Sequence, residues 1–209
     1  MLRPIKKNAS GFMQIISCGK INGMLTLFHA GFSIIKEPDV HIGRKNADFG
    51  QGFYLTSDAA FAHRWARERK GEQTIVNTYE LDTNNLSVRC FIRGEEWFEY
   101  IFKNRNNYSD ELNSDVIIGP IANDTIYDTF GIITSGFLKR EDALCLLQIG
   151  PAYEQVALKS DKAVKHLKWI SSEVLLPDTV AEYRKLVAEE EKKYQELFAE
   201  EMERISLSE

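Results

Sequence analysis

Short runs of apolar or alternating residues predict β-strands at five places in the chain. Residues 74–81 alternate β-branched and aromatic side chains with polar ones, which is typical of a strand with one buried face. A second run, 86–91, is expected to continue that strand after a turn at Asn84 and Asn85. The predicted strands are residues 25–29, 74–81, 86–91, 116–118 and 153–158.

Apolar residues that recur at three- and four-residue steps predict helices between these strands. Residues 59–70 follow Thr56, Ser57 and Asp58, any of which can cap a helix. The chain therefore mixes strands and helices along its length. The other predicted helices are residues 95–104, 123–133, 141–147 and one that begins at Asp161 and leads into Trp169.

Beyond Pro177 the chain changes character. Between Ala181 and Glu209 nine glutamates stand against five lysines or arginines, so most of the net negative charge of the protein lies there. The apolar residues of this tail recur at steps of three, four and seven, which predicts an amphipathic helix. Such a helix either packs against its own domain or offers a pairing surface to another chain. We therefore divide the chain into an N-terminal extension (1–24), a central domain (25–176) and an acidic helical tail (177–209).

Composition narrows the classes of function only a little. The 209 residues carry a net charge of −5, so a general electrostatic grip on nucleic acid is not expected, and only a local basic patch would provide one. Cys18, Cys90 and Cys145 are scattered and no histidine pairs with them, so we expect no metal site. With no signal segment and no run of membrane-spanning length, we expect a cytoplasmic protein without a membrane partner.

The stretch 48–56, with the sequence DFGQGFYLT, carries the strongest local signal. Gly50 and Gly52 lie two residues apart among aromatic side chains, and glycine lets a backbone turn sharply or approach a ligand closely. On a short strand after this turn, Tyr54 and Thr56 would share one face. The stretch is therefore either an ordinary turn within a sheet or one wall of a small-molecule pocket that displays Tyr54.

This stretch resembles a motif of a known enzyme superfamily. Residues 49–54 (FGQGFY), together with the helix predicted after them, are similar to the second motif of NAD-dependent ADP-ribosyltransferases of the diphtheria-toxin and poly(ADP-ribose) polymerase type. With 43–48 (GRKNAD) in front, the stretch looks more closely like a bacterial family of uncharacterised ADP-ribosyltransferase-like proteins, DUF3990. Segments similar to later parts of that family follow in the same order at 118–127 and 154–160, and the resemblance covers about residues 25–172.

The resemblance implies both a fold and a ligand. The fold would be an ADP-ribosyltransferase-like split α+β architecture, in which two antiparallel sheets enclose a cleft for NAD, followed here by the C-terminal amphipathic helix. NAD would be a substrate rather than a resident cofactor, and no metal is implied. The ADP-ribose would pass to a macromolecular acceptor that the sequence does not identify.

Several positions match residues that hold NAD in this superfamily. His29 matches the first-motif histidine that hydrogen-bonds the adenine-side ribose, and Ala30 and Gly31 stand where backbone contacts to the nicotinamide amide are expected. The usual His-Gly-Ser of that motif is His-Ala-Gly here. Tyr54 matches the tyrosine that stacks on nicotinamide, and Trp65 matches a second aromatic residue that encloses the ring. Aromatic faces attract a planar cation by about 1 kcal/mol or more when the site is desolvated.

Polar and glycine residues before this tyrosine are candidates for further contacts. Arg44 is expected to pair with the pyrophosphate as a bidentate donor. Asn46 and Asp48 would either fix the loop or contact ribose, and Gly52 would let the backbone approach the ligand. Asn123 or Asp124 is most simply the cap of the helix predicted after them. The resemblance alone implies that Asn123, Asp124 and Tyr127 lie at the rim of the cleft.

The third motif of the superfamily begins with a glutamate on a strand. That carboxylate holds the nicotinamide-side ribose and stabilises the transition state as nicotinamide leaves. Here the best match is Gln155, with Glu154 directly before it. Successive strand residues point to opposite faces, so only one of the two enters a cleft, and we assign that role to Gln155. A glutamine can hold a hydroxyl group but carries no charge.

From the resemblance we expect an NAD-dependent mono-ADP-ribosyltransferase with His29, Tyr54 and Gln155 as its catalytic residues. Two alternatives stay open: a catalytically weak or inactive NAD-binding module, which the glutamine favours, and an NAD glycohydrolase, in which water is the acceptor. Some relatives look like toxins encoded beside a small antitoxin. By that analogy alone, the helical tail would bind such a partner or self-associate.

Overall fold

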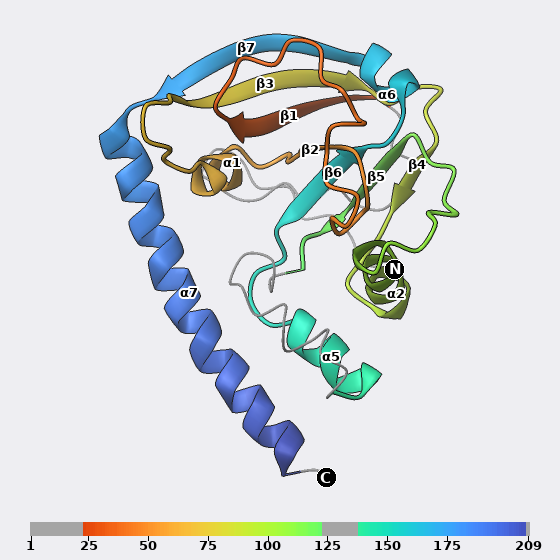
Figure 1. Cartoon of the computed structure of the whole chain (residues 1–209), viewed down its shortest axis with the longest axis vertical. Helices are drawn as coiled ribbons and strands as arrows, with labels where there is room; N and C mark the ends of the chain where they lie inside the picture. Colours follow the sequence, from red (N-terminus) through yellow and green to blue (C-terminus); the bar gives the residue numbers. More distant parts are fainter. Residues whose placement is uncertain (1–22, 123–137, 208–209) are drawn as a thin grey trace, which may run out of the picture.

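The computed structural model describes residues 23–122 and 138–207, and Figure 1 shows how its elements are arranged. The predicted helix at 123–133 and almost all of the N-terminal extension lie outside these residues. The strands are β1 (Met24–Gly31), β2 (Phe53–Leu55), β3 (Thr74–Asp82), β4 (Val88–Cys90), β5 (Val116–Pro120), β6 (Glu154–Leu158) and β7 (Leu167–Leu175). The helices are α1 (Ala59–Trp65), α2 (Glu95–Arg105), α5 (Arg140–Leu147), α6 (Asp161–Lys165) and α7 (Pro177–Ser206).

The first sheet has the strand order β1–β3–β7, and its neighbouring strands run antiparallel. The alternating run at 74–81 forms its central strand, as the pattern predicts. The sequence also predicts a helix from Asp161 through Trp169, and this prediction is wrong, because α6 ends at Lys165 and Trp169 lies within β7. The reason lies outside the segment: β3 has a second edge whose backbone groups need partners, and β7 satisfies them.

The second sheet has the order β2–β6–β5–β4, with β6 antiparallel to both of its neighbours. The sequence predicts that residues 86–91 continue the strand of the first sheet, but β4 pairs with β5 in the second sheet instead. This pair is parallel, so the sheets are mostly rather than entirely antiparallel. The cause is the helix between the two strands: α2 carries the chain back across the sheet, and such a crossover returns the next strand in parallel.

Apolar side chains between the two sheets form one of two main buried clusters. It contains Leu27, Tyr79 and Leu81 from the first sheet and Phe53, Leu55, Val116, Ile118, Val156 and Leu158 from the second. The opposite face of the second sheet packs against α2 and α5. This second cluster includes Phe49, Trp97, Phe98, Ile101, Ile117, Ala143, Leu147 and Ala157. The predicted α+β class is thus confirmed, with the second sheet as the middle layer.

A backbone bridge joins the edges of the two sheets. Phe28 of β1 and Thr56, directly after β2, exchange backbone hydrogen bonds of 2.8 and 3.0 Å. Asp58 then caps α1 by accepting from the backbone N–H groups of Ala60 and Phe61. The helix ends at Trp65, five residues before the predicted end, because the residues after the buried Ala66 are exposed and give it no face to bury.

The predicted C-terminal helix is confirmed as α7, which runs down one side of the molecule in Figure 1. Its first turn buries Val180 beside α1 and Leu175. Farther along, Tyr194 and Phe198 pack against Leu146 of α5. The helix therefore packs against its own domain, which is one of the two roles expected from its amphipathic pattern.

Candidate functional site

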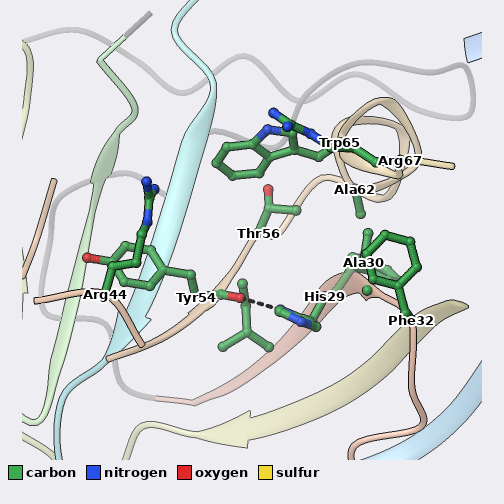
Figure 2. A pocket seen from close by; sticks show the side chains of 12 residues that line it. His29, Ala30, Phe32, Arg44, Tyr54, Thr56, Ala62, Trp65 and Arg67 are labelled. Carbon is green, nitrogen blue, oxygen red and sulfur yellow. Dashed lines mark hydrogen bonds between the residues drawn. The ribbon is translucent and has the colours of Figure 1, made fainter. Parts of the chain in front are cut away.

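A cavity of about 380 Å³ lies where the edges of both sheets approach α1 (Figure 2). Residues from β1, β2, α1 and the three segments that follow these elements line it, so its walls come from one continuous part of the chain between Phe28 and Arg67. Six of the ten residues predicted for the site line this cavity: His29, Ala30, Gly31, Arg44, Tyr54 and Trp65.

His29, near the end of β1, presents a defined hydrogen-bonding group to the cavity. Its Nδ1 lies 2.8 Å from the backbone carbonyl oxygen of Tyr54. A carbonyl only accepts, so Nδ1 carries the proton and Nε2 of the neutral ring is an acceptor. A Cβ at Gly31 would lie 3.3 Å from this Nε2, so the lack of a side chain at Gly31 leaves the nitrogen accessible to a ligand. Burial lowers the pKa of His29 below 6.5, against a smaller opposing effect of the hydrogen bond to Tyr54, and this favours the neutral ring.

Tyr54, in the middle of β2, is held by the loop that precedes it. Its hydroxyl donates to the carbonyl oxygen of Gly50 at 2.6 Å and accepts from the N–H of Phe49 at 3.0 Å. Gly50 has a φ of 72°, a conformation that glycine adopts without strain. Burial, and then the nearby Asp48 carboxylate, raise the pKa of Tyr54 well above its ordinary value, so the hydroxyl stays protonated. The ring is therefore fixed at the wall of the cavity.

Trp65 is the last residue of α1, and it is half-buried. Its ring packs against Phe61 at a centroid distance of 5.3 Å. In Figure 2 the indole lies on a different side of the cavity from Tyr54, with Thr56 between them. Asp58 caps the first turn of α1 and so fixes the residue at which the helix begins. This position determines that Trp65, the last residue of the helix, reaches the cavity. Two aromatic faces thus border one space, as a planar ligand requires.

The charged groups around the cavity are basic. Arg44 and Arg67 line it, both are exposed, and neither forms an ion pair within the described residues. No aspartate or glutamate is among the described residues that line it. Sequence reasoning did not identify Arg67, although it begins a basic run just after the predicted aromatic position. The cavity therefore suits an anionic ligand that also carries a flat ring.

Asp48 and Gln155 lie behind the cavity wall rather than on it. Asp48 is only 5% exposed, and its Oδ1 accepts from Arg105 of α2 at 2.9 and 2.6 Å. Its Oδ2 accepts from the N–H of Ala122 at 3.1 Å and from Nε2 of Gln155 at 3.3 Å. Gln155 is itself only 3% exposed. The two side chains join the loop, α2 and β6 in one buried polar network.

Glu154 points to the other face of β6 from Gln155, as alternation along a strand requires. Its carboxylate accepts from the hydroxyl of Ser57 at 3.0 Å, and its backbone carbonyl accepts from the hydroxyl of Thr56 at 2.9 Å. Thr56 lines the cavity, so Glu154 is one residue removed from it. Neither Glu154 nor Gln155 is among the described lining residues.

The remaining predicted residues have other surroundings. Asn46 is exposed and does not line the cavity, and Gly52 lies against the backbone of β6. A Cβ at Gly52 would come within 2.6 Å of the carbonyl oxygen of Leu158, so this position tolerates only glycine. Asn123, Asp124 and Tyr127 lie outside the described residues.

Comparison with known proteins gives one match. The profile of a family described as proteins of unknown function, DUF3990, matches residues 25–169, well over half of the chain. The chain belongs to the DUF3990 family. The matched span begins in β1 and ends in β7, so every residue that lines the 380 Å³ cavity of this DUF3990 protein lies within it. Neither a curated protein nor a solved structure shows a significant match.

Two further features concern membranes and metals. Within residues 23–122 and 138–207, no helix combines the length and the apolar character that a membrane crossing needs. In the same residues, no group of three histidine, cysteine, aspartate or glutamate side chains is arranged to hold a metal ion.

Proposed function

We propose that this DUF3990 protein is an NAD⁺-dependent mono-ADP-ribosyltransferase that binds NAD⁺ in the 380 Å³ cavity. The observation that carries the proposal is the grouping of His29, Tyr54 and Trp65 around one space, with two unpaired arginines beside them. These are the side-chain types that a dinucleotide with a cationic ring and a pyrophosphate requires. Chance would not be expected to bring together three residues that the family resemblance selects independently.

Each lining group has a defined task in this proposal. His29 Nε2 accepts a hydrogen bond from a ribose hydroxyl, which is a donor that matches the lone pair. Tyr54 and Trp65 offer their faces to the nicotinamide ring. Arg44 pairs with the pyrophosphate oxygens. The half-enclosed site holds the substrate in one orientation before any bond breaks.

The reaction would then proceed at the ribose carbon that carries nicotinamide. The bond from this carbon to the ring nitrogen breaks, and nicotinamide leaves as a neutral molecule with the bonding electrons. A nucleophile of the acceptor forms the new bond to the same carbon and loses its proton. In the proposal Gln155 holds the reactive ribose. Its side chain is buried behind the cavity wall and donates to Asp48, so this role requires the side chain to leave that partner and turn into the cavity when NAD⁺ binds.

A second candidate is an NAD⁺-binding module with little or no turnover. It is favoured by the absence of a carboxylate among the described residues that line the cavity. A carboxylate would stabilise the positive charge that develops as nicotinamide leaves, and an amide provides only a dipole. The two candidates predict the same binding site, but only the transferase releases nicotinamide and modifies an acceptor.

The deciding experiment follows both products at once. The purified protein is incubated with NAD⁺, with and without a bacterial lysate, and nicotinamide release and ADP-ribose mass additions are measured. The transferase proposal requires both signals, and Tyr54→Ala should abolish them while Tyr108→Ala, at an exposed position outside the cavity, should not. Release without mass additions identifies a glycohydrolase. NAD⁺ binding without release identifies the binding module.

A further inference from the structure

A second cavity adjoins the first. It has a volume of about 490 Å³ and lies between α1, Tyr153 and α7. Trp65 and Arg67 line both cavities, so the two spaces are neighbours on either side of the end of α1. A molecule in the second cavity would therefore lie next to whatever the first cavity holds.

The floor of the second cavity is aromatic and rigid. Phe61 and Tyr153 stack with a centroid distance of 4.3 Å and an interplanar angle of 10°. The Tyr153 hydroxyl donates to Glu190 of α7 at 2.7 Å and accepts from Arg64 at 2.6 Å. Arg64 also forms an ion pair with Glu190, which ties α1 to α7 across the cavity. These contacts give the cavity a fixed shape.

The charges that stay unpaired at this cavity are mainly positive. Glu190 offsets Arg64, whose buried Nε still has no hydrogen-bond partner. Arg67 and Arg184 are exposed and form no ion pair within the described residues. Glu191 is the one other carboxylate among the described lining residues. Two unpaired guanidinium groups on opposite walls therefore face a single unpaired carboxylate.

The basic character extends past the cavity. Arg69 and Lys70 follow Arg67 on the exposed segment after α1, where Glu68 lies between them and Arg69 forms an ion pair with Glu72. This is a local basic patch on a protein whose overall net charge is −5. It lies beside Trp65, a half-buried aromatic residue at the boundary of the two cavities.

We infer that the second cavity binds single-stranded nucleic acid. Arg67 and Arg184 would hold backbone phosphates, because the planar guanidinium fork matches phosphate oxygens bidentately. Trp65 would offer a stacking face to a base, as aromatic residues do in single-strand grooves. This aromatic face favours nucleic acid over an acidic peptide, which carries charge without flat bases. The binding site stands by itself, whereas its role as the acceptor site rests on the proposed transferase function.

Fluorescence anisotropy tests the binding directly, without NAD⁺. The probe is a short fluorescein-labelled single-stranded oligonucleotide, used as RNA and as DNA in parallel. We expect binding that weakens with salt, and at least a tenfold loss of affinity in the variant with both Arg67→Glu and Arg184→Glu. The slope of log affinity against log salt should also fall by about one for each arginine removed.

Lys193→Glu is the control for Arg184→Glu alone, because it makes the same charge change on an exposed residue of α7 that does not line the cavity. The control for the double variant adds Lys165→Glu, at a second exposed position outside the cavity. Both controls should bind like the wild type, and thermal melting should show that all variants fold. The inference is overturned if the wild type does not bind, if the double variant binds like its control, or if polyglutamate competes as well as unlabelled oligonucleotide.

A second measurement adds NAD⁺ and records ADP-ribose additions to the oligonucleotide by mass spectrometry. The acceptor role requires additions by the wild type and Lys193→Glu, and at least tenfold fewer by Arg184→Glu. Oligonucleotide binding by a protein that turns over no NAD⁺, either with the oligonucleotide or with the bacterial lysate, would refute the proposed function and leave the binding site in place. Turnover of NAD⁺ by a protein that binds no oligonucleotide would refute this inference alone.

Discussion

The ring of His29 illustrates how one hydrogen bond determines the chemistry of a residue. Because Nδ1 donates to the carbonyl oxygen of Tyr54, Nε2 is left as an acceptor. Burial lowers the pKa of His29, while the hydrogen bond to Tyr54 opposes this effect, so the ring protonates only below its ordinary value of 6.5. Protonation would convert Nε2 into a donor and remove the group that accepts from ribose.

NAD⁺ binding should therefore depend on pH through His29. We expect a constant affinity between about pH 7 and pH 8, and a loss of affinity below about pH 6.5 as the ring becomes charged. Isothermal titration calorimetry across this range would measure it. His29→Ala should bind weakly at every pH, whereas the exposed His41→Ala should retain the wild-type profile. A pH profile that persists in His29→Ala would show that another group is responsible.

The same residue should contribute to folding stability with a defined sign. The folded-state pKa of His29 lies below the unfolded value, so the unfolded chain binds the proton more readily. The stability contributed by the neutral ring is complete above about pH 6.5 and is lost as the pH falls from there through the lowered folded-state pKa. Urea unfolding of wild type and His29→Ala at several pH values would separate this contribution.

The Tyr54 hydroxyl and the Tyr54 ring should have separable effects. Tyr54→Phe keeps the face that borders the cavity and loses two hydrogen bonds to the loop, so it should cost about 1–3 kcal/mol of stability and leave NAD⁺ affinity within a few-fold. Tyr54→Ala removes the face and should abolish measurable binding. Chemical unfolding and calorimetry on both variants would test this. Equal losses of affinity in the two variants would contradict a role for the ring.

At the scale of single residues, the sequence predicted the residues that line the cavity better than the buried residues that hold its wall in place. His29, Tyr54 and Trp65 lie beside recognisable glycines or on a predicted helix, and all three line the same space. The partner of Asp48 could not be inferred, because Arg105 is 57 positions away on a helix whose pattern does not show which polar residue turns inward. Long-range polar pairing depends on the tertiary arrangement, which local spacing does not encode.

Among the elements, the loop before β2 is anchored by the buried ion pair of Asp48 and Arg105. Asp48→Asn would leave the Arg105 charge without its partner, and we expect a loss of about 3–5 kcal/mol in the free energy of unfolding. Glu96→Gln, which breaks an exposed ion pair with Arg89, should cost under about 1 kcal/mol. Urea denaturation would measure both. If both variants lost under about 1 kcal/mol in the free energy of unfolding, water would have to reach the buried pair.

The docking of α7 should depend on its buried face alone. Phe198→Ala removes a side chain that is 6% exposed and packs beside Tyr194, so it should destabilise the protein by about 3–5 kcal/mol or release the end of the helix. Leu197→Ala, at the neighbouring position, removes a side chain that is 39% exposed and should cost about 1 kcal/mol or less. Hydrogen exchange along α7 would distinguish global from local loss. Equal effects would contradict the observed packing.

The elements that the sequence predicted correctly are those with a local signal. α2, α5 and β3 start and end within a residue or two of their predicted bounds, because their apolar periodicity is strong. The sequence predicts a helix where the first half of β7 lies, and it predicts β4 correctly as a strand but places it beside the wrong partner; in both cases the partner strand decides the outcome. A run that tolerates either structure becomes a strand when a sheet edge needs backbone partners.

On the scale of the whole molecule, the proposed NAD⁺ site spans the two sheets, which also meet through the apolar cluster between them and the backbone bridge of Phe28 and Thr56. A ligand held by β1, β2 and α1 should therefore stabilise the complete fold. We expect NAD⁺ at about 100 times its dissociation constant to add roughly 2.7 kcal/mol to the free energy of unfolding. Differential scanning calorimetry would detect the rise in Tm.

The matched variants for this measurement are Trp65→Ala, which should lose the NAD⁺-dependent rise in Tm, and Tyr108→Ala, which should keep it. An absent shift in the wild type, at concentrations where binding is shown by another method, would mean that NAD⁺ binds the unfolded chain or a site outside the fold.

The strand order has a consequence for how the chain reaches its fold. β6 lies between β2 and β5, and β7 completes the first sheet against β3, so both sheets need residues beyond position 153. During synthesis, β3 and β5 leave the ribosome long before the strands that cover them. Contacts between such distant segments slow folding, since each one closes a long loop. The backbone groups at the edges of β3 and β5 therefore stay unpaired until β6 and β7 have been synthesised. Rapid synthesis of these strands, or binding by chaperones, would keep the exposed edges from pairing with other chains.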